Sequence, residues 1–176
     1  MQVAYRWSRA QFVRASLYDY ELGPNSRRRK VVTMVVIIAI LGTLGLNYAH
    51  RGFAQSDLVL VAVGLLWYAM RGKLLAWSFR RAFDRAQSTP MSLQFDLSED
   101  ELATTVNDQT NRMPWSQLKR VVRTPEGFLL YPGPMWLPVA HLQGEASAEQ
   151  MAALLQRKVD DYQDRQHHKL KLKDDD

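Results

Sequence analysis

The sequence predicts an α+β membrane protein, in which an N-terminal transmembrane helical hairpin precedes a small antiparallel β-sheet or half-barrel with a C-terminal helix. Two apolar stretches, residues 31–48 and 58–70, lie close together near the start of the chain, and basic residues flank the pair. Short strand-like segments follow at a spacing of about ten residues, which favours an antiparallel sheet over alternating strands and helices.

The first apolar stretch is long enough to cross a bilayer. Residues 31–48 contain no charged side chain, and a helix of this length spans about 27 Å, close to the ~30 Å hydrocarbon core. The second stretch reaches a similar length if its helix begins near Phe53 or continues past Arg71. The side chains of Arg71 and Lys73 would then extend to the lipid headgroups. We therefore expect transmembrane helices at 31–48 and at 53–79, the second with a cytoplasmic extension.

Two other interpretations of the apolar stretches are open. A cleaved signal peptide would have a shorter apolar core directly after a basic start, whereas about thirty polar and aromatic residues come first here. A pair of buried helices in a soluble domain is also conceivable, although uninterrupted apolar stretches of ~18 residues are uncommon outside membranes.

Basic residues predict the orientation of the hairpin. The connecting loop offers only Arg51, whereas lysines and arginines flank both outer ends of the pair, and such residues favour the cytoplasmic side. Both termini are therefore expected in the cytoplasm. The flanking residues are Arg27, Arg28, Arg29 and Lys30 before the first stretch, and Arg71, Lys73, Arg80, Arg81 and Arg85 after the second.

Residues 1–30 are expected to form a cytoplasmic lead with a short strand and a helix. Val3, Tyr5 and Trp7 alternate with polar or small residues, which is the period of a strand. Ser8 and Gln11 then have the spacing of a helix capping box. The same residues also fit one amphipathic helix lying on the membrane.

Residues 87–163 are expected to form the β-domain. From residues 87–90 onward, strands are predicted at 93–97, 101–106, 121–123, 128–131 and 135–139, with turns at 98–100, 107–108, 124–127 and 132–134. A closing helix begins at Ser147 and carries one apolar stripe. The stripe consists of Met151, Leu154, Leu155, Val159 and Tyr162. Residues 164–176 are rich in charge and are expected to be a mobile tail.

Strands followed by a capped helix are the order of a pleckstrin-homology-like (PH-like) domain, and the chain resembles the YcxB-like family of bacterial two-span membrane proteins. The resemblance rests on Met113-Pro114-Trp115-Ser116-Gln117-Leu118 and on Trp136-Leu137-Pro138-Val139-Ala140-His141-Leu142, in family order and spacing. It covers the chain to about Tyr162 and implies a bacterial inner-membrane protein with a PH-like cytoplasmic domain. Val139-Ala140 stands where relatives carry a basic pair, so any contact made by that pair is not expected here.

Side chains suited to catalysis or metal binding are scarce. The chain has no cysteine, and its four histidines lack the spaced partners of a zinc site. Glu99, Asp100 and Glu101 fall in a solvated turn rather than in an apolar pocket. We therefore expect no enzyme activity, no catalytic or metal site, no cofactor and no nucleic-acid binding.

Two sets of residues are candidates for binding. The first is basic and would either contact anionic lipid headgroups or only fix orientation during insertion; it consists of Arg27, Arg28, Arg29, Lys30, Arg71, Lys73, Arg80 and Arg81. The second would line a groove for a partner, unless its aromatic residues fill the core instead; it consists of Trp115, Trp136, Pro138 and His141.

These patterns favour a membrane-anchored, non-enzymatic interaction module. It would present a PH-like domain at the cytoplasmic face to a membrane or cytoplasmic protein, or to anionic inner-leaflet lipid. A second copy of the chain is also left open as a partner. The alternative is a regulatory or protective inner-membrane protein that acts through the hairpin itself, for example as an inhibitor of another membrane protein or as an immunity-type protein.

Overall fold

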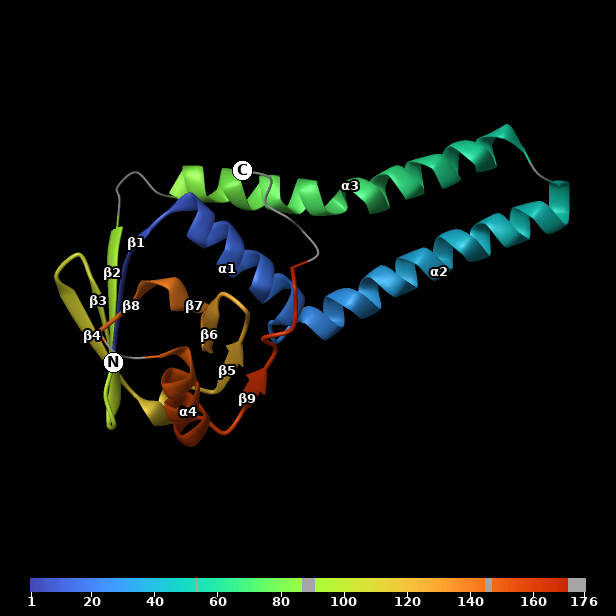
Figure 1. The fold of residues 1–176 in the computed structure, drawn as a ribbon. Helices are drawn as coiled ribbons and strands as arrows, with labels where there is room; N and C mark the ends of the chain where they lie inside the picture. Colours follow the sequence, from blue (N-terminus) through green and yellow to red (C-terminus); the bar gives the residue numbers. More distant parts are fainter. Residues whose placement is uncertain (53, 87–90, 145–146, 171–176) are drawn as a thin grey trace.

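A computed structural model describes residues 1–52, 54–86, 91–144 and 147–170. A strand and a helix precede two long helices, and a β-rich domain with one further helix follows (Figure 1). The elements are β1 (Gln2–Trp7), α1 (Arg9–Leu22), α2 (Ser26–Arg51), α3 (Gln55–Ala86), β2 (Met91–Leu97), β3 (Glu101–Val106), β4 (Gln109–Pro114), β5 (Arg120–Arg123), β6 (Gly127–Tyr131), β7 (Met135–Pro138), β8 (Leu142–Gln143), α4 (Ala148–Lys158) and β9 (Tyr162–Asp164), with short 3-10 turns η1 (Trp115–Gln117) and η2 (Val139–His141). The expected α+β fold with a hairpin is confirmed. Phe53 and residues 87–90, from which the strand pattern was expected to begin, lie outside the described residues.

The lead belongs to the β-domain. β1 lies between β2 and β8 in the sheet β4-β3-β2-β1-β8, and Val3 is paired with Phe95. The alternative of a single interfacial helix over the lead is therefore wrong. Because strands from before and after the two long helices share one sheet, residues 2–7 and 91–97 lie on the same side of any membrane that these helices cross.

The second sheet, β7-β6-β5-β9, completes the core of the domain. Its central strand β6 is buried along its whole length, and α4 packs over the core through Met151, Leu154 and Leu155. The capping box that begins α4 is formed, with Ser147 and Gln150 bonding to each other's backbone amide at 3.1 and 3.0 Å. An antiparallel β-domain closed by a capped helix agrees with the sequence pattern.

The helical stripe ends earlier than predicted. α4 stops at Lys158, Val159 is an extended cap residue, and Tyr162 lies in β9. β9 pairs with β5 in parallel, and Arg120 donates a hydrogen bond of 2.5 Å to the Asp161 carboxylate just before it. Tyr162 contacts the core, as predicted. It does so from β9, and not from the closing helix to which its spacing had assigned it.

Two other segments differ from the prediction. β4 was not expected, because Gln109–Pro114 is mostly polar and exposed; it pairs with β3 through a tight turn in which Asn107 and Asp108 have φ values of 45° and 72°. Residues 164–170, assigned to the tail, lie against the domain. His168 contacts Glu21 at 2.6 Å, and Leu170 packs against the apolar clusters.

The hairpin projects away from the domain, and its two helices diverge from their joined ends (Figure 1). Both are long and apolar enough to cross a membrane. No residue of α2 is buried, which makes the soluble-core interpretation wrong. A Cβ atom added at Gly42, Gly45 or Gly64 would meet nothing within 4 Å. Within the described residues, these glycines therefore do not bring the two helices together.

Candidate functional site

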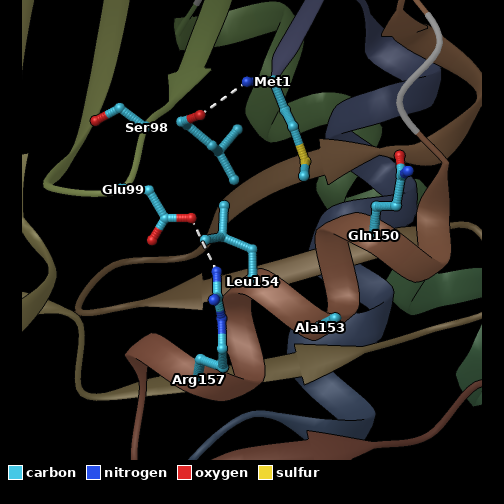
Figure 2. Close-up of a pocket in the computed structure, with 8 residues that line it drawn as sticks. Met1, Ser98, Glu99, Gln150, Ala153, Leu154 and Arg157 are labelled. Carbon is cyan, nitrogen blue, oxygen red and sulfur yellow. Dashed lines mark hydrogen bonds and ion pairs between the residues drawn. The ribbon is translucent and has the colours of Figure 1, made fainter.

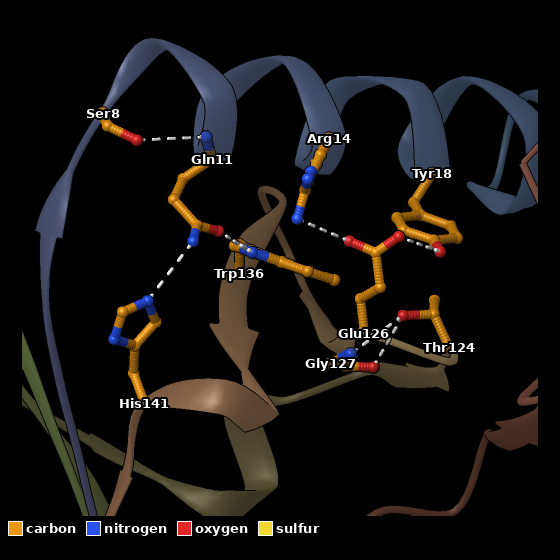
Figure 3. A network of polar contacts seen from close by, with 9 residues as sticks. All are labelled: Ser8, Gln11, Arg14, Tyr18, Thr124, Glu126, Gly127, Trp136 and His141. Carbon is orange, nitrogen blue, oxygen red and sulfur yellow. Dashed lines mark hydrogen bonds and ion pairs between the residues drawn. The ribbon is translucent and has the colours of Figure 1, made fainter. Parts of the chain in front are cut away.

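The side chain of Trp136, expected in a partner groove, lies beneath α1 (Figure 3). Its Nε1 donates a hydrogen bond of 2.8 Å to Oε1 of Gln11, and its ring stacks on that of Tyr18 with centroids 5.6 Å apart. Only 1% of Trp136 is exposed. α1 therefore covers Trp136, which was expected to be open to a partner.

A polar seam surrounds this contact (Figure 3). Arg14 forms an ion pair of 3.1 Å with Glu126, and the Tyr18 hydroxyl donates to the same carboxylate at 3.2 Å. Burial, together with the negative charge of Glu126, raises the pKa of the Tyr18 phenol. Gln11 also contacts His141 at 3.5 Å. The predicted Ser8–Gln11 capping box is thus only half formed: Ser8 accepts from the Gln11 amide at 3.3 Å, while the Gln11 side chain joins α1 to the β-domain.

The predicted partner groove is wrong for three of its four residues. Trp115 is 7% exposed, Trp136 and Pro138 are buried, and only His141 is exposed. The alternative weighed for the aromatic residues, that they fill the core, holds for both tryptophans. The cover over Trp136 comes from a helix 125 residues earlier in the chain, which no local pattern could indicate.

The predicted basic set divides by its surroundings. Arg27, Arg28 and Lys30 are exposed on the first turns of α2. Arg29 is half-buried and held by Asp19 and Tyr20. On α3, Arg71 and Arg81 are exposed, and their guanidinium groups lie 4.2 Å from the Tyr68 ring and 5.2 Å from the Trp77 ring. Lys73 is exposed and Arg80 is half-buried. Arg29 therefore has a structural role that the sequence did not reveal.

A second seam, which is apolar, joins α1 to the C-terminal part of α3. Val13, Leu17 and Ala76 are buried there, with Phe12, Leu75 and Phe79 packed around them. Arg9 and Asp84 close one end with an ion pair of 2.8 Å. The periodicity of residues 12–20 indicated a helix, but the chain gave no sign of which helix would cover it.

An open groove of about 470 Å³ lies between α4 and the β2–β3 turn (Figure 2). Its apolar floor includes Leu97, Ala153 and Leu154. At its rim Glu99 is bonded to Arg157 at 2.9 Å and to Lys158 at 3.0 Å. These hydrogen bonds, from Lys158 foremost, lower the pKa of Glu99. α4, which borders the groove, lies on the side of the domain away from the hairpin (Figure 1).

The groove and the seams hold no recognisable catalytic arrangement. Among residues 1–52, 54–86, 91–144 and 147–170, no three metal-ligating side chains of histidine, aspartate or glutamate come together. What the described surface offers instead is shape and hydrogen bonding: the groove beside α4, and the outer edge of β4, which ends its sheet. Both suit recognition of another chain.

Comparison with known families identifies the β-rich part of the chain. Residues 97–155, from the end of β2 to near the end of α4, match the family model described as YcxB-like protein. The resemblance stated from the two proline–tryptophan segments is thereby confirmed over these residues. No curated protein and no solved structure matches the chain. The PH-like relationship stays a prediction.

Proposed function

We propose that this protein is a membrane-anchored, non-enzymatic docking module of a bacterial inner membrane. The hairpin would hold a PH-like domain at the cytoplasmic face, where the domain binds a protein partner. The basic residues that remain exposed, Arg27, Arg28 and Lys30 on α2 with Arg71, Lys73 and Arg81 on α3, would contact anionic headgroups and keep the domain near the bilayer.

The orientation follows from two arguments together. The pairing of β1 with β2 requires that the hairpin begin and end on one side of the membrane. Lysines and arginines lie at that side, whereas the hairpin tip carries Arg51 neutralised by Asp57 at 3.0 Å. Basic flanks favour the cytoplasm. The domain would therefore face the cytoplasm with both ends of the described chain.

The position of two surface features supports the docking role. α4, which borders the groove, and β4, whose outer edge ends its sheet, both lie on sides of the domain away from the hairpin (Figure 1). An extended peptide adding to β4 would satisfy its free backbone groups, and the apolar groove floor would take a side chain.

The experiment is proximity crosslinking in native membranes followed by mass spectrometry. Ala153→Glu places a charge on the groove floor, and Asn111→Pro disrupts the β4 edge. Gln156→Glu, on an exposed position of α4 outside the groove, is the matched control. We expect at least one protein captured by the wild type and by Gln156→Glu to be lost from one of the two test variants. An identical partner list for all four proteins would contradict the proposal.

The alternative, that the hairpin itself acts on another membrane protein, is favoured by one observation. α2 and α3 diverge and bury almost nothing against each other, so their apolar surfaces are free to meet other helices. Exchanging residues 34–70 for an unrelated pair of apolar segments separates the two functions, because Arg29 and the α3 residues that pack on α1 stay in place. Docking survives the exchange, whereas action through the hairpin does not.

A further inference from the structure

Each arm of the hairpin is fixed to α1, but at a different place and by different chemistry. The arm formed by α2 is held by a polar elbow, which we define as Asp19, Tyr20, Arg29 and Tyr131. The arm formed by α3 is held by the apolar seam around Val13, Leu17 and Ala76. α1 itself rests on the β-domain through Trp136 and Glu126.

The elbow links the β-domain to the first turn of α2. The Tyr131 hydroxyl on β6 donates a hydrogen bond of 2.8 Å to Oδ1 of Asp19. The guanidinium of Arg29 donates to the Tyr20 carbonyl at 3.1 Å, lies 3.8 Å from the Asp19 carboxylate and stacks over the Tyr20 ring at 4.8 Å. The guanidinium of Arg29 is thus bound by groups of the protein rather than by lipid headgroups. These contacts fix the direction in which α2 leaves the domain.

At the other end, the two arms are joined by a clamped turn. The Asp57 carboxylate, which is buried, accepts a hydrogen bond of 3.1 Å from the Ala54 amide and pairs with Arg51. Between this turn and α1, none of α2 is buried. The separation of the arms at the domain end is therefore set by where α1 holds each of them, and not by contact between the arms.

We propose that α1 is a strut that keeps the two arms apart, and that loosening the elbow lets α2 move toward α3. The open positions at Gly42, Gly45 and Gly64 leave room for close approach of the two backbones, because small residues allow helices in lipid to pack closely. The spacing of the arms within the membrane is thereby coupled to the seat of α1 on the β-domain. This inference rests on the hairpin lying in a bilayer and not on the identity of any partner.

Spin labels measure the spacing directly. The chain has no cysteine, and Val36→Cys with Met70→Cys introduces two labels at exposed positions of α2 and α3 while leaving Gly42, Gly45 and Gly64 in place. Pulsed dipolar spectroscopy of the full chain in nanodiscs gives the distance distribution. The test variants are Arg29→Gln and Tyr131→Phe, and the matched control is Arg28→Gln, which removes the same charge from an exposed neighbouring position.

We expect Arg29→Gln and Tyr131→Phe to shift the distribution toward that of helices in contact, whose axes lie roughly 8–10 Å apart. The control should leave it unchanged. An unchanged distribution in both test variants would overturn the proposal, as would an equal shift in Arg28→Gln, because charge alone would then be the cause. If Arg29→Gln fails to fold, Tyr131→Phe removes only one hydroxyl group and decides the outcome.

Discussion

The two long helices have similar apolar stretches but are attached to the rest of the protein in opposite ways. α3 contributes Ala76 to a buried cluster, and Leu75 and Phe79 pack around it. α2 contributes no buried residue and is held through Arg29. An apolar seam is non-directional and tolerates small shifts, whereas a hydrogen-bonded elbow fixes geometry and fails when one partner is removed. The molecule therefore has one attachment made by apolar packing and one that depends on individual hydrogen bonds and an ion pair.

The largest effect should come from removing the contact between α1 and the β-domain, because both attachments depend on α1. Trp136→Ala deletes the ring beneath α1, and truncation of a buried aromatic residue costs about 3–5 kcal/mol. Urea unfolding in detergent micelles, followed by fluorescence, would measure the loss. Trp77→Ala is the control because this side chain is 56% exposed; a comparable loss there would mean that Trp136 has no special role.

The apolar attachment is tested by Leu17→Ala. Leu17 is 1% exposed in the seam with α3, and such a truncation costs about 2–5 kcal/mol. The C-terminal part of α3 should then detach, so that trypsin cleaves faster after Arg80, Arg81 and Arg85. Leu74→Ala, at a position that is 47% exposed, should leave the cleavage rate unchanged, and equal acceleration by both variants would refute the seam.

The polar attachment should be weaker in stability terms. Tyr131→Phe removes the hydrogen bond to the Asp19 carboxylate, for which we expect a loss of about 1–2 kcal/mol in the urea unfolding experiment. The exposed Tyr48 on the hairpin arm supplies the control variant Tyr48→Phe. A loss for Tyr131→Phe as large as that for Leu17→Ala would remove the distinction between the two attachments.

The smallest effect is expected at Asp161, which belongs to neither attachment, and it concerns the stability of the protein at acid pH. The hydrogen bond from Arg120, and secondarily one from Gln163, lowers the pKa of Asp161. In the unfolded chain an aspartate has a pKa of about 3.9, so the unfolded state takes up the proton first. The contribution is present above that pKa and is lost as pH falls through the folded value. Asp161→Asn should therefore flatten the decline of the urea midpoint below about pH 5. Asp160→Asn, at an exposed neighbour, should keep the wild-type decline.

Local signals in the sequence predicted the elements better than their partners. Alternation at Val3, Tyr5 and Trp7 identified β1, and the Ser147–Gln150 box identified the start of α4. β4 was missed because its exposed polar residues carry no apolar alternation. Tyr162 was misplaced because its spacing continued that of the helix while its backbone did not.

The candidate site was harder to predict, because its outcome depended on tertiary packing. Trp136 was expected either in a partner groove or in the core, and Arg29 belonged to a basic set expected either to contact lipid headgroups or to fix orientation. In the structure Trp136 contacts α1 and Arg29 contacts the end of α1. The contact of Trp136 joins residues 125 positions apart, so no local pattern indicates it. For Arg29, the sequence does not indicate whether a basic side chain binds lipid or another part of the protein.

The pairing of β1 with β2 also constrains how the protein is made. β1 and α1 leave the ribosome before the hairpin, but their sheet partners follow only after residue 90. The early strand must wait, with its apolar face unsatisfied, while the hairpin is inserted, and pairing between distant segments is slow. A chain with only one of the two helices inserted would leave its two halves on opposite sides of the membrane, where β1 and β2 could not pair.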